Sequence, residues 1–385
     1  MQKDSKIYIA GHRGLVGSAI LDELKQQGYK NLVFKTHSEL DLTNQKAVNE
    51  FFEKEKPEFV ILAAAKAGGI AANNTYRADF IYENLMIEAN VIHSSFKYKV
   101  KKLLFIASTT IYPKNANTPT NEKQMLGGDL EYTNKPYAIA KIAGLMLCES
   151  YNIQYNTNFI AITPINLYGN NDKFDLEKAH VMPALLRKFH LAKLLENNNE
   201  KALLRDLNLN SLSEAKAYLA KYGVNEKSVE IWGDGTPTRE FLHSKDLAKA
   251  VMFVMQNVDF KDLKIKDKEI TNTHLNVGVN ENISIKELAF LIKDIVGFNG
   301  DIVFNKDRPN GAINKLTDCS KIHSLGWKHK INLKEGIIMM YEWYKNTYSR
   351  GGGISFEYFI IANYHSIYTD NVYDFANSMQ RICNV

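Results

Sequence analysis

The chain has 385 residues, of which 45% are apolar and 24% charged, a composition typical of a soluble protein large enough for two lobes. The net charge of +5 comes from 48 basic and 43 acidic residues without a long basic run, which argues against nucleic-acid binding. No apolar run is long enough to cross a membrane, and no apolar leader precedes the first strand, so we expect a cytoplasmic protein. The three cysteines lack metal-ligand spacing, so we expect no metal site.

The first predicted elements are an apolar strand over residues 7–10, a glycine-rich turn, and a helix of about 11–14 residues that ends at Gly28. Gly11 suits the tight turn, Gly14 lets the backbone approach a pyrophosphate, and Gly17 lets the helix pack against the strand. The amino end of the helix then faces the phosphates. This pattern predicts a dinucleotide site. Its expected cofactor contacts are Gly11, His12, Arg13, Gly14, Leu15, Val16 and Gly17.

The second predicted strand, residues 31–35, ends in basic and hydroxyl side chains and not in the carboxylate that holds the ribose of NAD. Arg13, Lys35 and His37 can instead meet a 2′-phosphate, which favours NADPH over NADH. The alternative is that these residues are solvated surface cations. Further cofactor contacts are expected from Asp41 and Leu42.

Two more apolar strands, residues 59–65 and 102–108, flank a helical segment over residues 73–95. This alternation of strands and helices predicts an α/β fold with a doubly wound parallel sheet. Small residues at the end of the earlier strand leave room for the cofactor, and the later strand delivers Ser108 to the sheet edge where ligands bind. The expected cofactor contacts here are Ala63, Ala65 and Ile106.

A Tyr-x-x-x-Lys sequence follows, with Pro136 suited to a helix start. Tyr137 and Lys141 are four residues apart and therefore share one helix face. A phenol with a pKa of about 10 is a poor acid–base catalyst at neutral pH. A nearby ammonium group and a positively charged nicotinamide bring that pKa toward the working range. Ser108 is placed to hydrogen-bond the carbonyl that is reduced.

The motifs of residues 11–18, 63–74 and 136–144 resemble those of the GDP-L-fucose synthases, which are extended short-chain dehydrogenase/reductases. The likeness runs from about residue 7 to about residue 344. It implies a Rossmann-type sheet with a smaller C-terminal substrate-binding α/β lobe. In such enzymes NADPH reduces the C4 keto group of a GDP-linked 4-keto-6-deoxy sugar.

The resemblance also implies residue roles. Tyr137 gives the proton, Lys141 holds the nicotinamide ribose, and Ser108 orients the substrate. His180 matches an acid of the coupled C3/C5 epimerisation, although a packed or capping histidine is an equal alternative. The implied cofactor contacts also include Pro164, Asn166, Leu167 and His180. The implied substrate contacts are Ser108, Thr110, Asn166, Lys188, Trp232, Arg239 and Lys315.

Two of these substrate contacts carry their own arguments. The guanidinium group of Arg239 suits a diphosphate, because it can form two parallel hydrogen bonds. The alternative for Trp232 is an aromatic residue of the core.

The chain departs from the family at Thr110, where the family carries the cysteine whose thiolate is the epimerisation base. A threonine hydroxyl is too weak an acid for that role. We therefore hypothesise that reduction survives, that the epimerase step is weak or lost, and that a separate upstream epimerase acts first. Threonines at 109 and 110 also argue against a 4,6-dehydratase, which needs an Asp-Glu pair there.

We expect an NADP-binding Rossmann domain from residues 1–170 plus about 237–260, and a nucleotide-sugar lobe from residues 171–236 plus about 270–345. The tail, 346–385, has no assigned role. Residues 191–228 are longer than the corresponding connection in the family, and we expect them either to cap the sugar site or to lie on the surface away from it. Because a lid and substrate selectivity go together, a heptose is also a candidate for the sugar.

Two other functions stay open, a nucleotide-sugar 4-epimerase with tightly bound NAD and a non-catalytic NADPH-binding protein. A homodimer is implied by the resemblance, through the helices that carry Asn84 and Tyr137.

Overall fold

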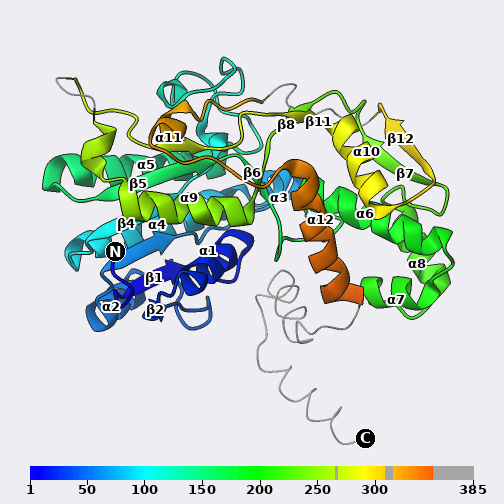
Figure 1. The fold of residues 1–385 in the computed structure, drawn as a ribbon, viewed down its shortest axis with the longest axis horizontal. Helices are drawn as coiled ribbons and strands as arrows, with labels where there is room; N and C mark the ends of the chain where they lie inside the picture. Colours follow the sequence, from blue (N-terminus) through cyan, green and yellow to red (C-terminus); the bar gives the residue numbers. More distant parts are fainter. Residues whose placement is uncertain (178, 265–267, 308–314, 350–385) are drawn as a thin grey trace, which may run out of the picture.

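The computed structural model describes residues 1–177, 179–264, 268–307 and 315–349. These residues form two lobes that lie side by side (Figure 1). Nearly all of the predicted tail lies outside the described residues. Within the described ranges no helix is long and apolar enough to span a membrane, and no three His, Cys, Asp or Glu side chains gather as a metal site.

The larger lobe is built on a six-stranded sheet with the order β10-β5-β4-β3-β1-β2. All of its neighbouring strands are parallel, so the predicted doubly wound α/β class is confirmed. The strands are β1 (Ile7–Ala10), β2 (Leu32–Val33), β3 (Phe59–Leu62), β4 (Lys102–Ile106), β5 (Phe159–Pro164) and β10 (Leu275–Val277). The first strands pair in register with Ile7 opposite both Leu32 and Phe59.

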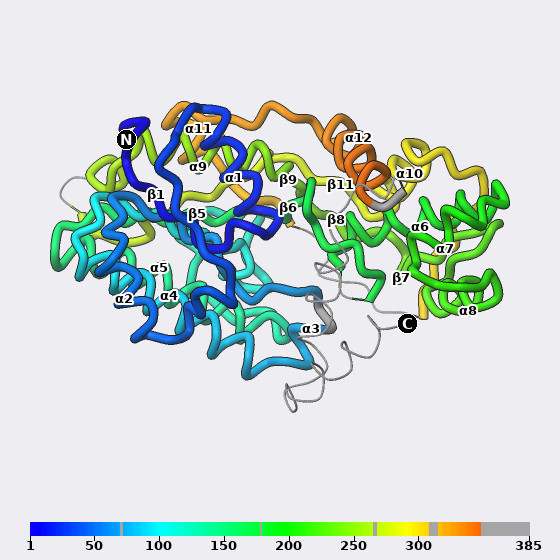
Figure 2. Tube along the Cα trace, turned by 90° about the horizontal axis from the view of Figure 1, so that it is seen from below, coloured from blue at the N-terminus to red at the C-terminus, as the bar shows by residue number. Residues whose placement is uncertain are grey.

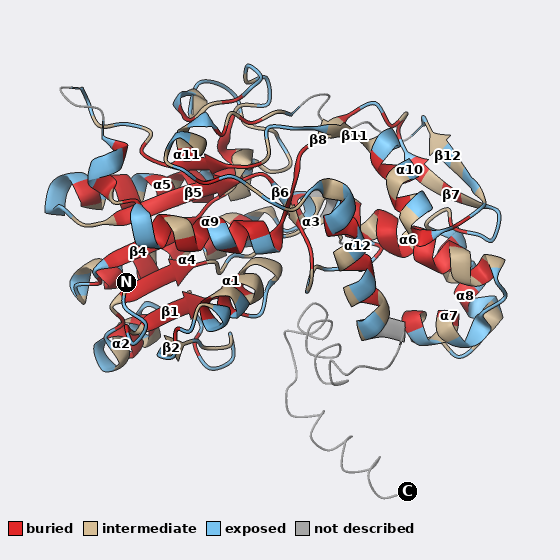
Figure 3. Ribbon diagram, in the orientation of Figure 1, coloured by how far each residue is buried: buried red, intermediate tan, exposed pale blue. Residues whose placement is uncertain are grey.

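Helices cover both faces of this sheet (Figures 1 and 2). One face carries α1 (Leu15–Gln26) and α9 (Ser244–Asn257), and the other carries α2 (Gln45–Glu55), α4 (Arg77–Lys97) and α5 (Lys135–Tyr155). Successive strand residues point to opposite faces, and both sets are buried, as Figure 3 shows.

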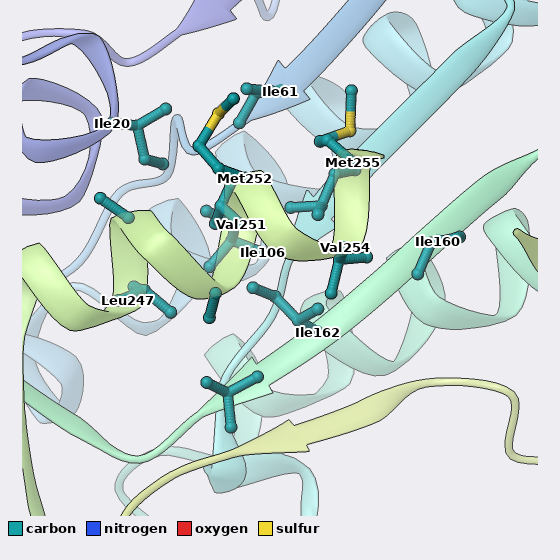
Figure 4. Packing of buried hydrophobic residues seen from close by; sticks show 14 of the residues in the cluster. Ile20, Ile61, Ile106, Ile160, Ile162, Leu247, Val251, Met252, Val254 and Met255 are labelled. Atoms are coloured by element: carbon teal, nitrogen blue, oxygen red, sulfur yellow. The ribbon is translucent and has the colours of Figure 1, made fainter. Parts of the chain in front are cut away.

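The first face shows how this packing is made. Ile106 and Ile162 pack against Val251 of α9 on that face (Figure 4).

The helical segment predicted over residues 73–95 is two helices, α3 (Ile70–Thr75) and α4. Tyr76 separates them because its backbone, with φ −103° and ψ 45°, lies outside the helical region. The 3₁₀ turns η1 (Thr109–Ile111), η2 (Glu122–Gln124) and η3 (Phe260–Leu263) lie between the longer elements.

The smaller lobe has its own apolar core. Its helices are α6 (Val181–Glu196), α7 (Glu200–Leu207), α8 (Leu212–Ala220), α10 (Ile285–Val296) and α12 (Leu333–Tyr344), which continues as a π-helical turn over Lys345–Ser349. Strands β7 (Ser228–Trp232) and β12 (Asp301–Asn305) pair in parallel. At the start of α10, Ser284 and Glu287 form a capping box.

Short strand pairs lie where the chain passes between the lobes. They are β6 (Asn166–Tyr168) with β9 (Phe241–His243), and β8 (Thr238–Arg239) with β11 (Ile283–Ser284). The expected domain boundary differs from the structure after residue 270. Strand β10 and helix α11 (Ser320–Ser324) fall in the range expected for the smaller lobe, yet they belong to the larger one. The reason is packing, because Leu275, Val277 and Ile322 are fully buried in the core of the larger lobe.

The long link over residues 191–228 forms the end of α6 together with α7 and α8. The chain breaks between α6 and α7 at Asn199, whose side chain caps α7 by accepting from the Ala202 N–H. Arg187 of α6 forms a buried ion pair with Asp206 of α7 at 2.9 Å. Both new helices lie at the outer end of the smaller lobe, away from the larger lobe (Figures 1 and 2). They therefore elaborate the surface and do not cap the site described below.

Candidate active site

The glycine-rich turn between β1 and α1 has the geometry of a phosphate cradle. Gly11 has a φ of +86°, in the region that favours glycine. A Cβ on Gly17 would lie 2.0 Å from the carbonyl oxygen of Gly11, so only glycine fits there. Gly14 directly precedes α1 and supplies no side-chain cap, which leaves the first N–H groups of the helix to an anion. This turn therefore fits the pyrophosphate of a dinucleotide.

His12, Arg13, Leu15 and Val16 belong to the same turn and the start of α1. His12 is 9% exposed, and its ring packs at a tilt against the ring of Phe34, with 4.6 Å between centroids. Burial and the charge of Arg13 lower the pKa of His12. His12 is therefore neutral at pH 7, and Arg13 carries the positive charge of this turn.

The region after β2 holds both basic and acidic side chains. Lys35 and His37 are the basic residues here, and His37 lies 4.0 Å from Asp41. Residues 35–38 carry no carboxylate, and the next acidic side chain, Glu39, folds back onto Thr36. Its carboxylate accepts from both the N–H and the hydroxyl of Thr36, at 2.7 Å each, and lies 3.7 Å from Lys35. This carboxylate is thus committed to its own turn.

The other expected cofactor residues follow the ends of neighbouring strands. Ala63 and Ala65 continue the chain beyond β3, where Ala63 donates its N–H to the Ala10 carbonyl. Leu42 is buried, and its carbonyl accepts from Asn90 of α4. Pro164 ends β5, and Asn166 and Leu167 form β6. Ala63, Ala65 and Pro164 therefore lie at the carboxyl ends of parallel strands of the large sheet, where open α/β sheets bind ligands.

Tyr137 and Lys141 lie one turn apart near the start of α5, which begins with Pro136 in its first turn. The Lys141 ammonium is 5.6 Å from the centroid of the Tyr137 ring. It donates to the carbonyl of Ile106 at 3.1 Å and lies 3.1 Å from a carboxylate oxygen of Glu88. The predicted pair is therefore assembled at the carboxyl end of β4.

The environment of Tyr137 keeps its phenol protonated. Burial raises the pKa of Tyr137, and the charge of Glu88 adds to this effect, while Lys141 opposes it. We expected the ammonium group to lower this pKa, but here burial outweighs it. A protonated phenol is the form that a proton donor needs before the reaction begins.

Ser108 and Thr110 lie just after β4, in and beside η1. The Ser108 hydroxyl oxygen accepts from the Thr110 N–H at 3.3 Å. Its hydroxyl proton can therefore still be donated to a substrate carbonyl. The Thr110 hydroxyl is buried and has no hydrogen-bond partner among the described residues. Buried polar atoms are normally satisfied, so a ligand is the expected partner.

A cavity opens beside η1. Three of the predicted substrate residues line it, Thr110, Asn166 and Lys315, together with Glu240 and Thr317. Glu240 is 3% exposed and accepts from the Thr317 hydroxyl at 2.6 Å through one oxygen. Its other oxygen has no hydrogen-bond partner in the described part of the chain. Burial raises the pKa of Glu240 to about 7.

The remaining substrate candidates, Lys188, Trp232 and Arg239, are not among the described residues that line this cavity. Lys188 of α6 donates to the Glu230 carbonyl of β7 at 3.0 Å, and burial lowers its pKa to about 8. Trp232 ends β7 and is 59% exposed, so it is not the core aromatic that was its alternative. Burial lowers the pKa of Arg239, and burial together with the charge of Arg239 lowers the pKa of Lys315.

His180 is the residue that precedes α6, and its side chain makes no capping hydrogen bond. It is exposed. No contact in the described residues joins it to Tyr137 or Lys141, so its predicted role in catalysis stays a prediction.

Two acidic residues of the site, Glu88 and Glu240, were missed from the sequence. Glu88 interrupts the apolar face of a predicted helix one turn after Asn84, which is a signal that such a face carries a polar partner. Glu240 directly follows Arg239, the residue chosen for the diphosphate. The sequence pattern that pointed to Arg239 could therefore also have pointed to the carboxylate beside it.

The comparisons with known proteins agree with this geometry. The profile described as "NAD dependent epimerase/dehydratase family" matches residues 7–278. "Putative GDP-L-fucose synthase 2" of Arabidopsis thaliana is 49% identical over 344 residues, which cover 89% of this chain and 93% of that protein.

Two solved structures are also similar. DdhaC is 74% identical with a TM-score of 0.81, covering 90% of this chain and 98% of that one. MlghC, a GDP-mannoheptose C4 reductase from Campylobacter jejuni with NADP bound, is 56% identical with a TM-score of 0.81, covering 90% and 99%. The chain therefore belongs to the NAD dependent epimerase/dehydratase family, in the branch of the GDP-L-fucose synthases and GDP-heptose C4 reductases.

Proposed function

We propose that this chain is an NADPH-dependent oxidoreductase that reduces the C4 keto group of a GDP-linked 4-keto sugar, a hexose or a heptose. The observation that carries the proposal is the buried Lys141 ammonium beside the protonated Tyr137, at the strand end that also presents Ser108. The relatives named above support the same chemistry.

The residues of the larger lobe have different roles in the proposed reaction. The glycine turn and the end of β2 hold the cofactor, which supplies a hydride when bound. Ser108 donates a hydrogen bond to the carbonyl oxygen of the substrate. Tyr137 gives its proton to that oxygen as negative charge develops there, and Lys141 stabilises the phenolate that is left.

The cationic side chains suit the nucleotide part of the substrate. Arg239 and Lys188 are each held where burial disfavours a positive charge, and a diphosphate would offset that cost. The 56% identity to a GDP-mannoheptose C4 reductase supports a heptose as the first sugar to test.

A panel assay tests the proposal. NADPH oxidation is followed with GDP-, dTDP- and UDP-linked 4-keto sugars, hexoses and heptoses, each with and without an added epimerase. The expected result is turnover confined to GDP-linked 4-keto sugars. Tight co-purifying NAD without net NADPH consumption would point to a 4-epimerase instead.

Loss of epimerase activity is a separate part of the proposal, and Thr110 supports it. Its hydroxyl has no buried base as a partner among the described residues, so it lacks the activation that proton abstraction needs. A separate epimerase would then act before this enzyme. In heavy water, we expect no deuterium uptake at C3 or C5 of the 4-keto sugar, and rapid uptake would contradict the proposal.

A homodimer through α4 and α5 also belongs to the proposal. Ile139, Met146 and Ile153 are exposed and recur every seven residues on α5, so they lie on one face. Tyr82 of α4 is also 62% exposed. Light scattering on the full chain is expected to give twice the monomer mass, and Ile153→Asp is expected to give monomers.

A further inference from the structure

The catalytic lysine has a buried acidic partner that the reaction as described above does not use. Glu88 lies on α4 and Lys141 on α5, two helices that pack side by side (Figure 1). Their charged groups are 3.1 Å apart, and the side chains are 1% and 2% exposed. An ion pair this deeply buried must be matched within the fold, because neither charge can be solvated by water.

The space for this pair is shaped by a glycine. A Cβ on Gly144 would lie 2.7 Å from a carboxylate oxygen of Glu88 and 2.6 Å from the Phe105 ring. The Lys141 ammonium lies 4.7 Å from the centroid of the same ring. Glu88, the Phe105 ring and the Ile106 carbonyl therefore surround the ammonium group and fix its place below Tyr137.

The charges of the two groups depend on each other. Burial alone would lower the pKa of Lys141, but the Glu88 carboxylate and Tyr137 raise it above the ordinary value. Burial raises the pKa of Glu88 to about 7, so the carboxylate is ionised above that pH. Two other titratable groups face Glu88, Tyr137 and Cys148, and burial raises the pKa of each, with Glu88 adding to the effect.

We propose that Glu88 is a positioning residue for the reduction: its carboxylate holds the Lys141 ammonium under Tyr137 and keeps both groups protonated until the proton is needed. The inference rests on the proposed reductase activity, because that activity requires a protonated phenol at the start. Glu88 acts through Lys141 and does not touch the substrate.

Glu88→Gln tests the proposal while keeping the size of the side chain. Loss of the negative charge makes Lys141 and Tyr137 release their protons at lower pH. The alkaline limb of the pH profile of kcat is therefore expected to move down by about 1–3 pH units. A role in folding alone would lower stability without moving that limb, and an unmoved limb overturns the proposal.

Glu149→Gln is the matched control. Glu149 is also a buried carboxylate on α5 and accepts from Thr273, but it lies two turns, about 12 Å along the helix, from Lys141. Its removal is expected to leave the alkaline limb unchanged. Glu88→Asp, which keeps the charge, is expected to retain the wild-type limb even where kcat falls.

A second measurement needs neither cofactor nor substrate. Without Glu88, burial depresses the pKa of Lys141 in the folded protein below its unfolded value. The unfolded chain then binds more protons between about pH 8 and 10, so stability rises with pH in that window. The Tm gap between Glu88→Gln and wild type is therefore expected to narrow from pH 8 to 10, and a constant gap contradicts the proposal.

The double variant Glu88→Gln/Lys141→Met provides a test in case the single variant Glu88→Gln does not fold. If Glu88→Gln does not fold but the double variant does, the ion pair is the cause, as proposed. If both fail, Glu88 has a role independent of Lys141 and the proposal is overturned. Because the Tm measurement involves no sugar, it tests the role of Glu88 separately from the proposed reductase activity.

Discussion

The site contains two groups of charged side chains that are treated differently by the fold. The catalytic group, Tyr137 and Lys141, is balanced from within by Glu88, so its charge is set before any ligand arrives. In the cationic group, Lys188, Arg239 and Lys315, burial lowers every pKa. Catalytic charge is therefore fixed by the protein, while binding charge is left for the ligand to complete.

The largest expected effect comes from removing the phenol of the catalytic group. Tyr137→Phe is expected to lower kcat by about 10²–10⁴-fold, because general acid catalysis contributes that much, while NADPH binding is retained. Steady-state kinetics and a fluorescence titration with NADPH check both parts. Tyr132→Phe, an exposed tyrosine just before α5, serves as the control, and an unchanged kcat for Tyr137→Phe refutes the mechanism.

The cationic group is expected to affect binding more than turnover. Arg239→Met removes charge-assisted hydrogen bonds worth about 1.5–3 kcal/mol, which corresponds to a rise in KM of about 10–150-fold. The exposed Arg205 of α7 gives the matched control, with an unchanged KM. A fall in kcat with constant KM would break the distinction between the two groups.

Binding of GDP is expected to depend on pH through Lys188. Its pKa of about 8 means that the ammonium charge is lost as pH rises from 7 to 9, so affinity falls over this range. The loss is expected to reach about tenfold, the value of one charge-assisted hydrogen bond. Calorimetric titration with GDP measures it, and Lys188→Met is expected to bind weakly with no change over this pH range.

The smallest effect is expected at Glu240. Glutamine keeps an oxygen that accepts a hydrogen bond, so Glu240→Gln is expected to raise KM by only about 2–10-fold. With a pKa of about 7, the wild-type carboxylate is protonated as pH falls below 7, and KM is expected to rise there. The variant is expected to show no such rise, and an identical pH profile in both proteins would remove Glu240 from the site.

Sequence patterns predicted those features that depend on residues close together in the chain. The glycine turn and the Tyr137–Lys141 spacing each depend on residues within one or two turns of each other, and the structure has them. The sheet class followed from the alternation of strands and helices.

The features that the sequence did not reveal are long-range or depend on one backbone angle. The pairing of Glu88 with Lys141 needs two helices to meet. The fold-back of Glu39 needs the turn at Thr36. The break at Tyr76 is a single residue outside helical geometry. Apolar spacing carries no information on any of these.

The position of β10 has a consequence for how the protein can be made. This edge strand pairs with β5, but the chain reaches it only after passing through most of the smaller lobe. A fragment cut at residue 170 would leave the backbone of β5 exposed along one side, and exposed strand edges promote aggregation. On the ribosome, too, the large sheet stays unfinished until residue 277 has emerged, so the two lobes mature together.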